Sequence, residues 1–196
     1  MGETGTTWRN LVFAPARALA LAACLAGALA PAAAAGTSEA LSVERSVKAA
    51  FLYKFLNYVE YPQALTDGNA PYVVGVAGAD DVAAELTRIA IGRSINNHPV
   101  QVRVLRAGDT LTGLHLLFVG AAEAARAAPL LRAAQQAGVL SVTEMPGALQ
   151  AGSVINFLVV DERVRFEVSL EAAEKSNLRL SSRLLSVAYA VQKGGS

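Results

Sequence analysis

The 196-residue chain contains a single cysteine, Cys24, and only two histidines, His98 and His115. Because Cys24 lies in the leader described below, the mature chain would contain no cysteine, which excludes disulfides, a thiol nucleophile and zinc–thiolate sites. An excess of charge of one sign is also missing, since the formal net charge is +1. A chain without a basic stripe lacks the composition that nucleic-acid binding requires, so that class of partner is excluded.

The first 35 residues have the organisation of a secretion signal. Two arginines form a positive n-region, residues 18–30 are apolar, and the small residues that end at Ala35 suit cleavage. The apolar run is too short to cross about 30 Å of hydrocarbon as a helix. We therefore expect a signal peptide over residues 1–35 and one exported domain over residues 36–196.

A second interpretation of the leader is a lipoprotein signal in which Cys24 becomes the acylated N-terminus. Only six apolar residues separate Arg17 from Cys24, fewer than an ordinary h-region has, so cleavage near Ala35 is favoured. Removal of the leader leaves fifteen basic and fifteen acidic residues. These charges are interspersed, and no polybasic run favours an anionic membrane surface.

Residues 50–62, AFLYKFLNYVEYP, contain five aromatic side chains. Helical periodicity begins at Ser42, a suitable N-cap, and Pro62 is expected to end the helix. At 100° per residue, one arc of this helix is apolar and forms the expected core stripe. Its members are Val47, Phe51, Phe55 and Tyr58, with Leu52 and Val59 at the edge.

Three further side chains of this helix fall on a different side. Tyr53, Asn57 and Tyr61 lie outside the core stripe, so one hydrophobic face does not account for all the aromatic residues. They would either cover a neighbouring helix or anchor a partner, because a tyrosine offers a large contact area with few rotatable bonds. They are candidate partner-binding residues.

Strand and helix patterns alternate through the middle of the chain. The expected strands are 72–78, 99–105, 114–120 and 139–144, and the expected helices are 80–90 and 121–138, the latter bent or restarted at Pro129 and ended at Gly138. Residues 154–160 and 164–168 then form a hairpin that turns at 161–163. This order predicts an α/β fold, a three-layer α/β/α sandwich with a mostly parallel sheet and an antiparallel C-terminal edge hairpin.

The chain is expected to close with two helices, over residues 171–177 and 181–192, the second capped by Ser181 or Ser182. Arg179 and Arg183 are four residues apart and would project from one face. They would be either solvated charges or anchors for a carboxylate on a partner.

No pattern indicates catalysis. The segment GVAGADD, residues 75–81, has only two glycines and no lysine, as in a tight strand-to-helix turn rather than a phosphate loop. His115 lies in an apolar run, where a buried, hydrogen-bonded histidine is expected. The polar loop GRSINNHP offers Arg93, Asn96 and His98 as candidate ligand-binding residues, without a second histidine or carboxylate at metal-ligand spacing. We expect no enzyme activity, no cofactor and no metal.

Three segments, in order, resemble the YfiR-like (HmsC-like) family of exported regulators. They are VKAAFLYKFLNYVEYP, IGRSINNHPVQVRVL and GSVINFLVVDERVRFEVSLEAAEKSNLRLSSRLLSVA, and together they span residues 47–188. The third carries the family's Ile-Asn-Phe, Arg-Phe-Glu and Leu-Ser-Ser-x-Leu-Leu patterns. Tyr61 departs from the family, whose opening helix usually ends in Trp-Pro.

The resemblance implies a non-catalytic periplasmic repressor. Such a protein binds the periplasmic sensor region of an inner-membrane diguanylate cyclase and lowers cyclic-di-GMP output and biofilm formation. An OmpA-like outer-membrane lipoprotein and a second copy of the chain are further candidate partners. Family members often carry a cysteine where this chain has His115, so redox control is not expected here. The alternative function is a periplasmic small-molecule-binding module, because an α/β sandwich has crevices at its strand ends.

Overall fold

A computed structural model describes residues 32–61 and 70–194 of the chain, with side chains from Glu39 onwards. The chain divides into two units, Met1–Ser38 and Glu39–Ser196, and the fold below is that of the second unit. The predicted signal peptide lies almost entirely outside the described residues. None of the helices described is long and apolar enough to cross a lipid bilayer.

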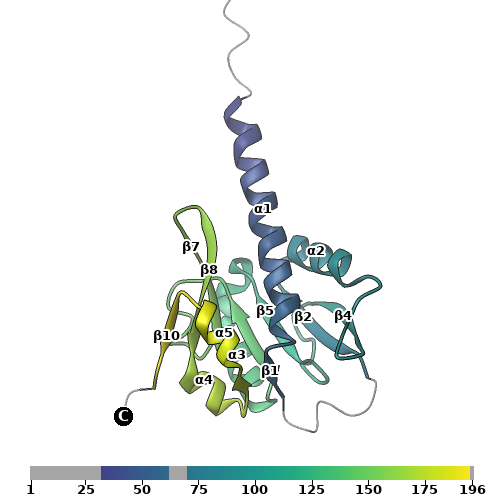
Figure 1. The fold of residues 1–196 in the computed structure, drawn as a ribbon, viewed down its shortest axis with the longest axis vertical. Coiled ribbons are helices and arrows are strands. Elements are labelled where there is room, and N and C mark those ends of the chain that lie inside the picture. The colour runs from purple at the N-terminus through teal and green to yellow at the C-terminus, as the bar shows by residue number, and fades with distance from the viewer. Residues whose placement is uncertain (1–31, 62–69, 195–196) are drawn as a thin grey trace, which may run out of the picture. The chain divides into compact units, whose positions relative to one another are not determined.

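Helices and strands follow one another in largely alternating order (Figure 1). The elements are α1 (Ala32–Phe55), β1 (Val59–Glu60), β2 (Tyr72–Ala77), α2 (Asp80–Ala90), β3 (Ser94–Ile95), β4 (His98–Leu105), β5 (Leu116–Val119), the 3₁₀ helix η2 (Ala121–Arg126), α3 (Ala127–Gln136), β6 (Leu140–Thr143), β7 (Ile155–Val160), β8 (Arg163–Ser169), α4 (Leu170–Lys175), β9 (Arg179–Leu180), α5 (Ser182–Val187) and β10 (Ala190–Gln192).

The main sheet has the strand order β10-β8-β7-β6-β5-β2-β4-β3. Strands β2, β4, β5, β6 and β7 run parallel, whereas β8 is antiparallel to β7 and β3 is antiparallel to β4. A separate two-stranded ladder joins β1 and β9. The predicted α/β class with a mostly parallel sheet is confirmed. The C-terminal hairpin is not the edge itself, because β10 pairs with the outer side of β8.

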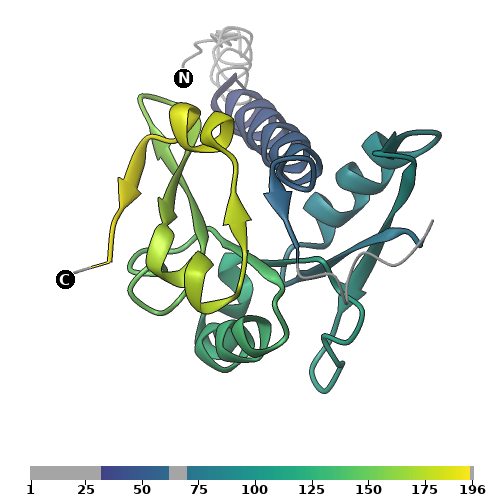
Figure 2. The ribbon, with the colours of Figure 1, turned by 60° about the horizontal axis from the view of Figure 1, so that its bottom comes forward.

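Both faces of the sheet are covered, as predicted for a sandwich. Alternate residues of β2 and β5 point to opposite faces, which is the period of a strand. One core lies under α1, α2 and α5 and includes Leu52, Phe55, Val74, Leu86, Phe118 and Leu184; the other lies under α3 and includes Ala77, Leu117, Val119, Ala134 and Val139. Figure 2 shows α1 and α2 on one side of the sheet and α3 on the other.

The first helix differs from the prediction at both ends. It begins at Ala32 rather than at Ser42, because the alanines before Gly36 are strong helix formers. Ser42 lies inside the helix, where its hydroxyl donates to the carbonyl of Glu39 at 2.7 Å. The helix ends at Phe55, before Pro62, which lies outside the described residues. The chain turns there to pair β1 with β9.

The last predicted helix is also shorter than expected. Helix α5 stops at Val187, and residues 190–192 form β10 instead. The amide of Tyr189 donates to the carbonyl of Phe166 at 2.8 Å and starts this pairing. Residues 190–192 therefore pair with the outer side of β8 as a strand, although their local sequence is compatible with a helix. Tertiary pairing overrides helix propensity here.

Candidate functional site

Four phenylalanines from distant parts of the chain form an aromatic cluster. Phe51 and Phe55 lie one turn apart on α1, with ring centroids 5.8 Å apart. Phe166 of β8 meets them edge-on at 5.4 and 5.1 Å, and Phe157 of β7 stacks on Phe55 at 5.9 Å. Phe157 and Phe166 belong to the Ile-Asn-Phe and Arg-Phe-Glu motifs. These two motifs therefore place the rings that seat α1 on the sheet.

A groove opens where this cluster reaches the surface between α1 and α5, with a volume of about 410 Å³. We call it the α1–α5 groove. Its lining residues are Phe51, Lys54, Phe55, Tyr58, Phe166, Arg183, Leu184, Ser186 and Val187. Its floor is aromatic and aliphatic, and none of its lining residues is acidic.

The groove carries two exposed cations, Lys54 and Arg183. Among the described residues, neither side chain makes an ion pair, whereas several other cations of the chain do. Val187, which lines the groove, is 63% exposed, and Tyr189, two residues further along the chain, is 59% exposed. An apolar floor with a polar rim is the anatomy of a protein-docking surface. The chemistry fits a partner that presents an apolar side chain together with carboxylates.

The end of α1 and the start of α5 are held together by backbone pairing. Ser181 donates its amide to the carbonyl of Tyr58 at 2.9 Å, and its hydroxyl accepts from the amide of Leu184, which caps α5. The prediction of a cap at Ser181 or Ser182 is thus confirmed for Ser181. Arg179 and Arg183 lie on different elements, since Arg179 is on β9 opposite Glu60 and Arg183 is on α5.

The three residues predicted to share a second face of the first helix do not do so, because the helix ends before two of them. Tyr53 remains on α1, half-buried, with its hydroxyl 3.4 Å from the carbonyl of Ser94 on β3. Asn57 is exposed in the turn after the helix. Of the predicted partner-binding residues, the structure therefore places Arg183 in the α1–α5 groove and Tyr53 beside β3, away from it.

Tyr61 lies after β1 and is half-buried. Its ring packs against Tyr72 at 5.9 Å and against His115 at 5.5 Å. Its hydroxyl is buried, and this burial, with a smaller contribution from Tyr72, raises its pKa above the ordinary value. A hydroxyl in this position is not available to a partner at the surface.

Of the two histidines, His115 is buried, as the sequence predicts. Its Nδ1 accepts the amide of Val73 at 3.1 Å, which assigns the ring proton of the neutral form to Nε2. His98 also has a structural partner, because its Nδ1 donates to the carbonyl of Ala70 at 2.7 Å. Both rings contact Tyr72, at 4.8 and 5.0 Å.

The segment predicted to be a polar, ligand-binding loop is a tight hairpin between β3 and β4. Asn96 and Asn97 form its two-residue turn with φ of 50° and 66°, a conformation that asparagine tolerates. Arg93 and Asn96 are exposed, and His98 is engaged with Ala70. The three residues are thus close in the fold, while ligand binding by them stays a prediction.

Lys48, which no sequence pattern marks as functional, is buried at the carboxyl ends of β5 and β6. It donates to Glu144 at 2.6 Å and to Glu44 one turn earlier on α1. Burial alone would lower the pKa of Lys48, but these hydrogen bonds together outweigh it, so the pKa lies above its ordinary value of 10.5. The second oxygen of Glu144 accepts the amide of Ala121 at 3.0 Å.

The position of the ion cluster formed by Lys48, Glu44 and Glu144 is relevant to the alternative function, a small-molecule-binding module. An α/β sheet usually binds ligands at its carboxyl edge, where the strand order reverses. Here the reversal lies between β2 and β5, and the backbones that follow these strands touch: a Cβ on Gly120 would lie 2.5 Å from the carbonyl oxygen of Gly78. Beside this contact, Lys48 and its carboxylates occupy the edge. This part of the carboxyl edge is therefore occupied by close backbone contacts and by the Lys48 ion cluster.

The asparagine of the Ile-Asn-Phe motif holds a buried polar network. Asn156 Oδ1 accepts from the hydroxyl of Thr143 at 2.8 Å and from the amide of Met145 at 3.0 Å. Its Nδ2 donates to Glu167, the glutamate of the Arg-Phe-Glu motif, at 3.0 Å. The two motifs are thus directly bonded to each other, which gives them a structural role.

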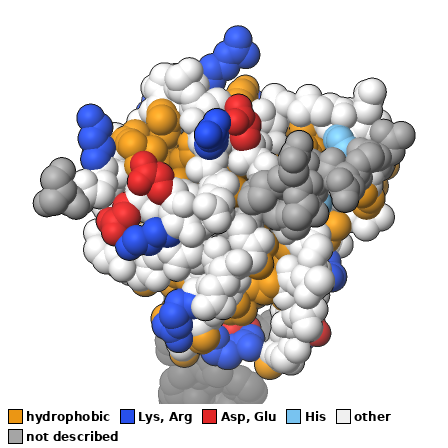
Figure 3. All heavy atoms as spheres, turned by 90° about the horizontal axis from the view of Figure 1, so that it is seen from below, with side chains coloured by type: hydrophobic (Ala, Val, Ile, Leu, Met, Phe, Trp, Pro, Cys, Tyr) orange, Lys and Arg blue, Asp and Glu red, His pale blue; other side chains and the backbone are white. Residues whose placement is uncertain are grey.

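Within the residues that the structure describes, no group of three or more His, Cys, Asp or Glu side chains is placed to hold a metal ion. On the face shown in Figure 3, acidic and basic side chains are interspersed between small hydrophobic areas. That face offers no continuous basic surface.

A search of solved structures supports the fold class. The chain is similar to a conserved domain protein from Vibrio cholerae O1 biovar El Tor strain N16961, with a TM-score of 0.53 and 10% sequence identity. The similarity covers 76% of this chain and 60% of that structure. At this identity the likeness shows the fold alone. No curated protein matches the chain.

A family comparison is more specific than the fold. The sequence profile described as YfiR/HmsC-like matches residues 45–189, a range that holds α1 from Arg45, the main sheet up to Tyr189 and both motifs of the polar network. The chain belongs to the YfiR/HmsC-like family, which is a regulatory, non-catalytic family known for periplasmic control of diguanylate cyclases.

Proposed function

We propose that this protein is a non-catalytic periplasmic repressor that docks on the sensor region of a membrane-bound diguanylate cyclase and lowers cyclic-di-GMP synthesis. Membership of the YfiR/HmsC-like family supports the cyclase as partner. The observation that supports a docking mechanism is the α1–α5 groove, where an aromatic floor lies beside two cations that make no ion pair with any residue the structure describes. Biofilm formation would fall as a consequence of the lower cyclic-di-GMP level.

The proposed contact combines an apolar anchor with charge. An apolar side chain of the cyclase would fill the groove over Phe51 and Phe166, and carboxylates would pair with Lys54 and Arg183. Asn57 and Arg179, on the segments that join at this end of α1, would extend the contact. Tyr53 and Tyr61 would instead fix the position of α1, through Ser94 and through the Tyr72 and His115 rings.

Docking would act by occupancy. A bound protein changes the activity of the cyclase only by as much as its affinity differs between the active and inactive conformations. A decisive shift requires several kcal/mol of differential binding free energy. Docking in the groove would remove its aromatic floor from water and form charge-assisted hydrogen bonds to Lys54 and Arg183. These contacts can supply several kcal/mol of binding free energy, because each hydrogen bond to a charged group contributes about 1.5–3 kcal/mol.

The first experiment is deletion of the gene, which should raise cellular cyclic-di-GMP. Complementation with the wild-type gene should restore the low level, whereas the double variant Lys54→Glu/Arg183→Glu should not. The matched control is Arg163→Glu/Arg165→Glu, two exposed arginines on β8 outside the groove, which should complement as the wild type does. Binding to the isolated periplasmic region of the cyclase should weaken at least about tenfold in the groove variant alone.

The possible outcomes test the repressor function and the α1–α5 groove independently. Unchanged cyclic-di-GMP after deletion, across growth conditions, would refute the repressor. A rise on deletion that the groove variant reverses fully would keep the repressor and remove the groove as its docking surface.

A further inference from the structure

Within the part of the chain that the structure describes, one side of strand β4 has no strand partner over most of its length. On its other side it pairs with β2 from Val100 to Leu105. The short strand β3 covers only its start, through Ser94 opposite Pro99 and Ile95 opposite His98. Among the described residues, no strand pairs with the outer side of residues 100–105. This edge is six residues long, about the length of a whole ordinary strand.

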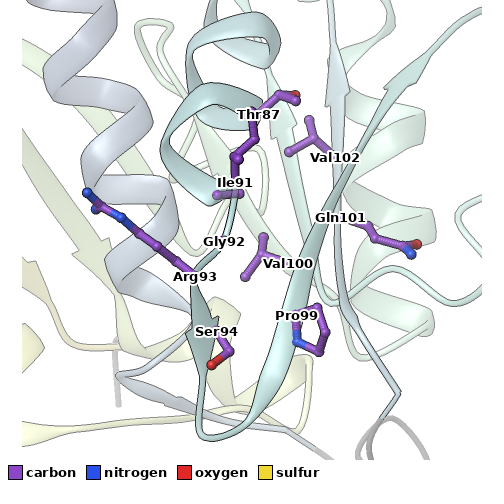
Figure 4. A pocket seen from close by; sticks show the side chains of 10 residues that line it. Thr87, Ile91, Gly92, Arg93, Ser94, Pro99, Val100, Gln101 and Val102 are labelled. Atoms are coloured by element: carbon purple, nitrogen blue, oxygen red, sulfur yellow. The ribbon is translucent and has the colours of Figure 1, made fainter.

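A groove lies along the first half of this edge, from Pro99 to Val102, between β4 and the chain that leads into β3. We call it the β4 groove; its volume is about 730 Å³. Val100 and Val102 of β4 and Ile91 at the end of α2 line it (Figure 4). The side chain of Ile91 is 72% exposed. The open backbone edge and the exposed apolar side chains thus lie together.

The charged side chains of the segment that forms this groove and edge are all positive. Residues 91–105, IGRSINNHPVQVRVL, contain two arginines and no aspartate or glutamate. Arg103 donates one Nη to the carbonyl of Thr110 at 2.6 Å and makes no ion pair among the described residues. Arg93 makes none either, and its side chain extends from the groove toward α1 (Figure 4). Two copies paired through this edge would bring four arginines together without a carboxylate, so charge disfavours self-pairing.

We infer that the β4 edge is a second docking surface, which binds an extended segment of a partner protein by adding it as a strand to the sheet. The segment would carry apolar residues at alternate positions, which enter the β4 groove, and acidic residues that pair with Arg103 or Arg93. Backbone pairing supplies affinity in this mode of recognition, and the side-chain pockets supply specificity. In the strand order of the sheet, β4 lies near the opposite edge from β8, so this surface is separate from the α1–α5 groove.

The test uses a labelled synthetic peptide, acetyl-Glu-Val-Thr-Val-Glu-Val-Thr-amide, titrated into the protein purified from cells that express the full chain. Saturable binding is expected, and a peptide with lysine in place of both glutamates should bind at least tenfold more weakly. Ile91→Asp and Arg103→Glu should each weaken binding of the acidic peptide about tenfold. The matched control is Val159→Asp, since Val159 is an exposed valine on β7 outside both grooves.

Amide hydrogen exchange locates the binding. Alternate amides of residues 100–105 should become protected when the acidic peptide is present, and amides of α5 should not. The inference is overturned by absence of saturable binding up to about 1 mM, by equal binding of the lysine peptide, or by protection elsewhere in the chain. It is also overturned if the protein alone forms a dimer that protects residues 100–105, because the edge then serves a second copy.

Discussion

Lys48 shows how a single residue can fix the position of a long helix. Its ammonium connects α1 to Glu144, which follows β6, and Glu144 in turn accepts the amide that starts η2. The side chains of Lys48 and Glu144 are only 11% and 16% exposed. Removal of one partner would leave a buried charge uncompensated, which costs more than the net contribution of the pair.

We expect Lys48→Met to lower the free energy of unfolding by about 3 kcal/mol, measured by urea denaturation at neutral pH. The double variant Lys48→Met/Glu144→Gln should recover much of this loss, because both charges are then absent. Lys175→Met is the control: its pair with Glu171 is exposed, so the loss should stay below about 1 kcal/mol. A Lys48→Met loss no larger than the control would contradict the proposed role.

The pH dependence of this pair has a definite sign. Folding raises the pKa of Lys48 above 10.5, so the folded protein holds this proton more tightly than the unfolded chain. The stabilisation is therefore complete below about pH 10.5 and is lost as pH rises through the folded pKa. In Lys48→Met, the fall in stability across that alkaline range should be smaller than in the wild type.

At the scale of elements, the short helix α5 depends on its cap. Its six residues are too few to be stable alone, so the bond from the Leu184 amide to Ser181 and the packing of Leu184 hold it. The same helix places Arg183 and Val187 at the α1–α5 groove. Stability of α5 and the shape of the groove are thus linked.

Ser181→Ala should cost about 1 kcal/mol of unfolding free energy, whereas Ser182→Ala, at the exposed neighbouring position, should cost less than half of that. Urea denaturation of the two variants and the wild type measures these differences in unfolding free energy. If the groove binds the cyclase, Ser181→Ala should also weaken that binding at a temperature where the protein remains folded. Equal costs for the two serines would show that the cap does not stabilise α5.

At the scale of the whole molecule, the compact unit begins at Glu39, close to the predicted mature start at Gly36. The helix continues back to Ala32, but the α1 residues buried in the core begin at Lys48 and Ala49. A chain that starts at Gly36 would therefore lose none of the packing described.

We expect the leader to be removed, so that N-terminal sequencing of the protein purified from the periplasmic fraction begins near Gly36. We also expect this form to unfold in one cooperative transition. Its midpoint in urea should match that of a chain that starts at Ala32. An N-terminus at an acylated Cys24 would favour the lipoprotein alternative. Two separate transitions would contradict a single domain over residues 36–196.

The sequence alone determined the features that depend on neighbouring residues. Four features each have their own local signal: the strand expected at 72–78, the helix at 80–90, the helix end at Gly138 and the hairpin turn at 161–163. The structure contains all four, although the strand ends at Ala77 and Arg163 already belongs to β8. The order of these elements predicted the layers of the sandwich, because strand–helix alternation favours a parallel sheet between helices. The motifs that identified the family are local as well.

Tertiary structure decided what depends on residues far apart in the chain. The pairing of β1 with β9 ends α1 at Phe55 and removes Asn57 and Tyr61 from its face, and the open side of β8 converts residues 190–192 into a strand. Lys48 finds Glu144 only in the fold, and Lys54 and Arg183 come together only because α5 packs beside α1. Buried backbone groups and charges in a folded chain need hydrogen-bond or ionic partners, and these partners come from residues that are near in space. Spacing along the sequence does not show which residues those are.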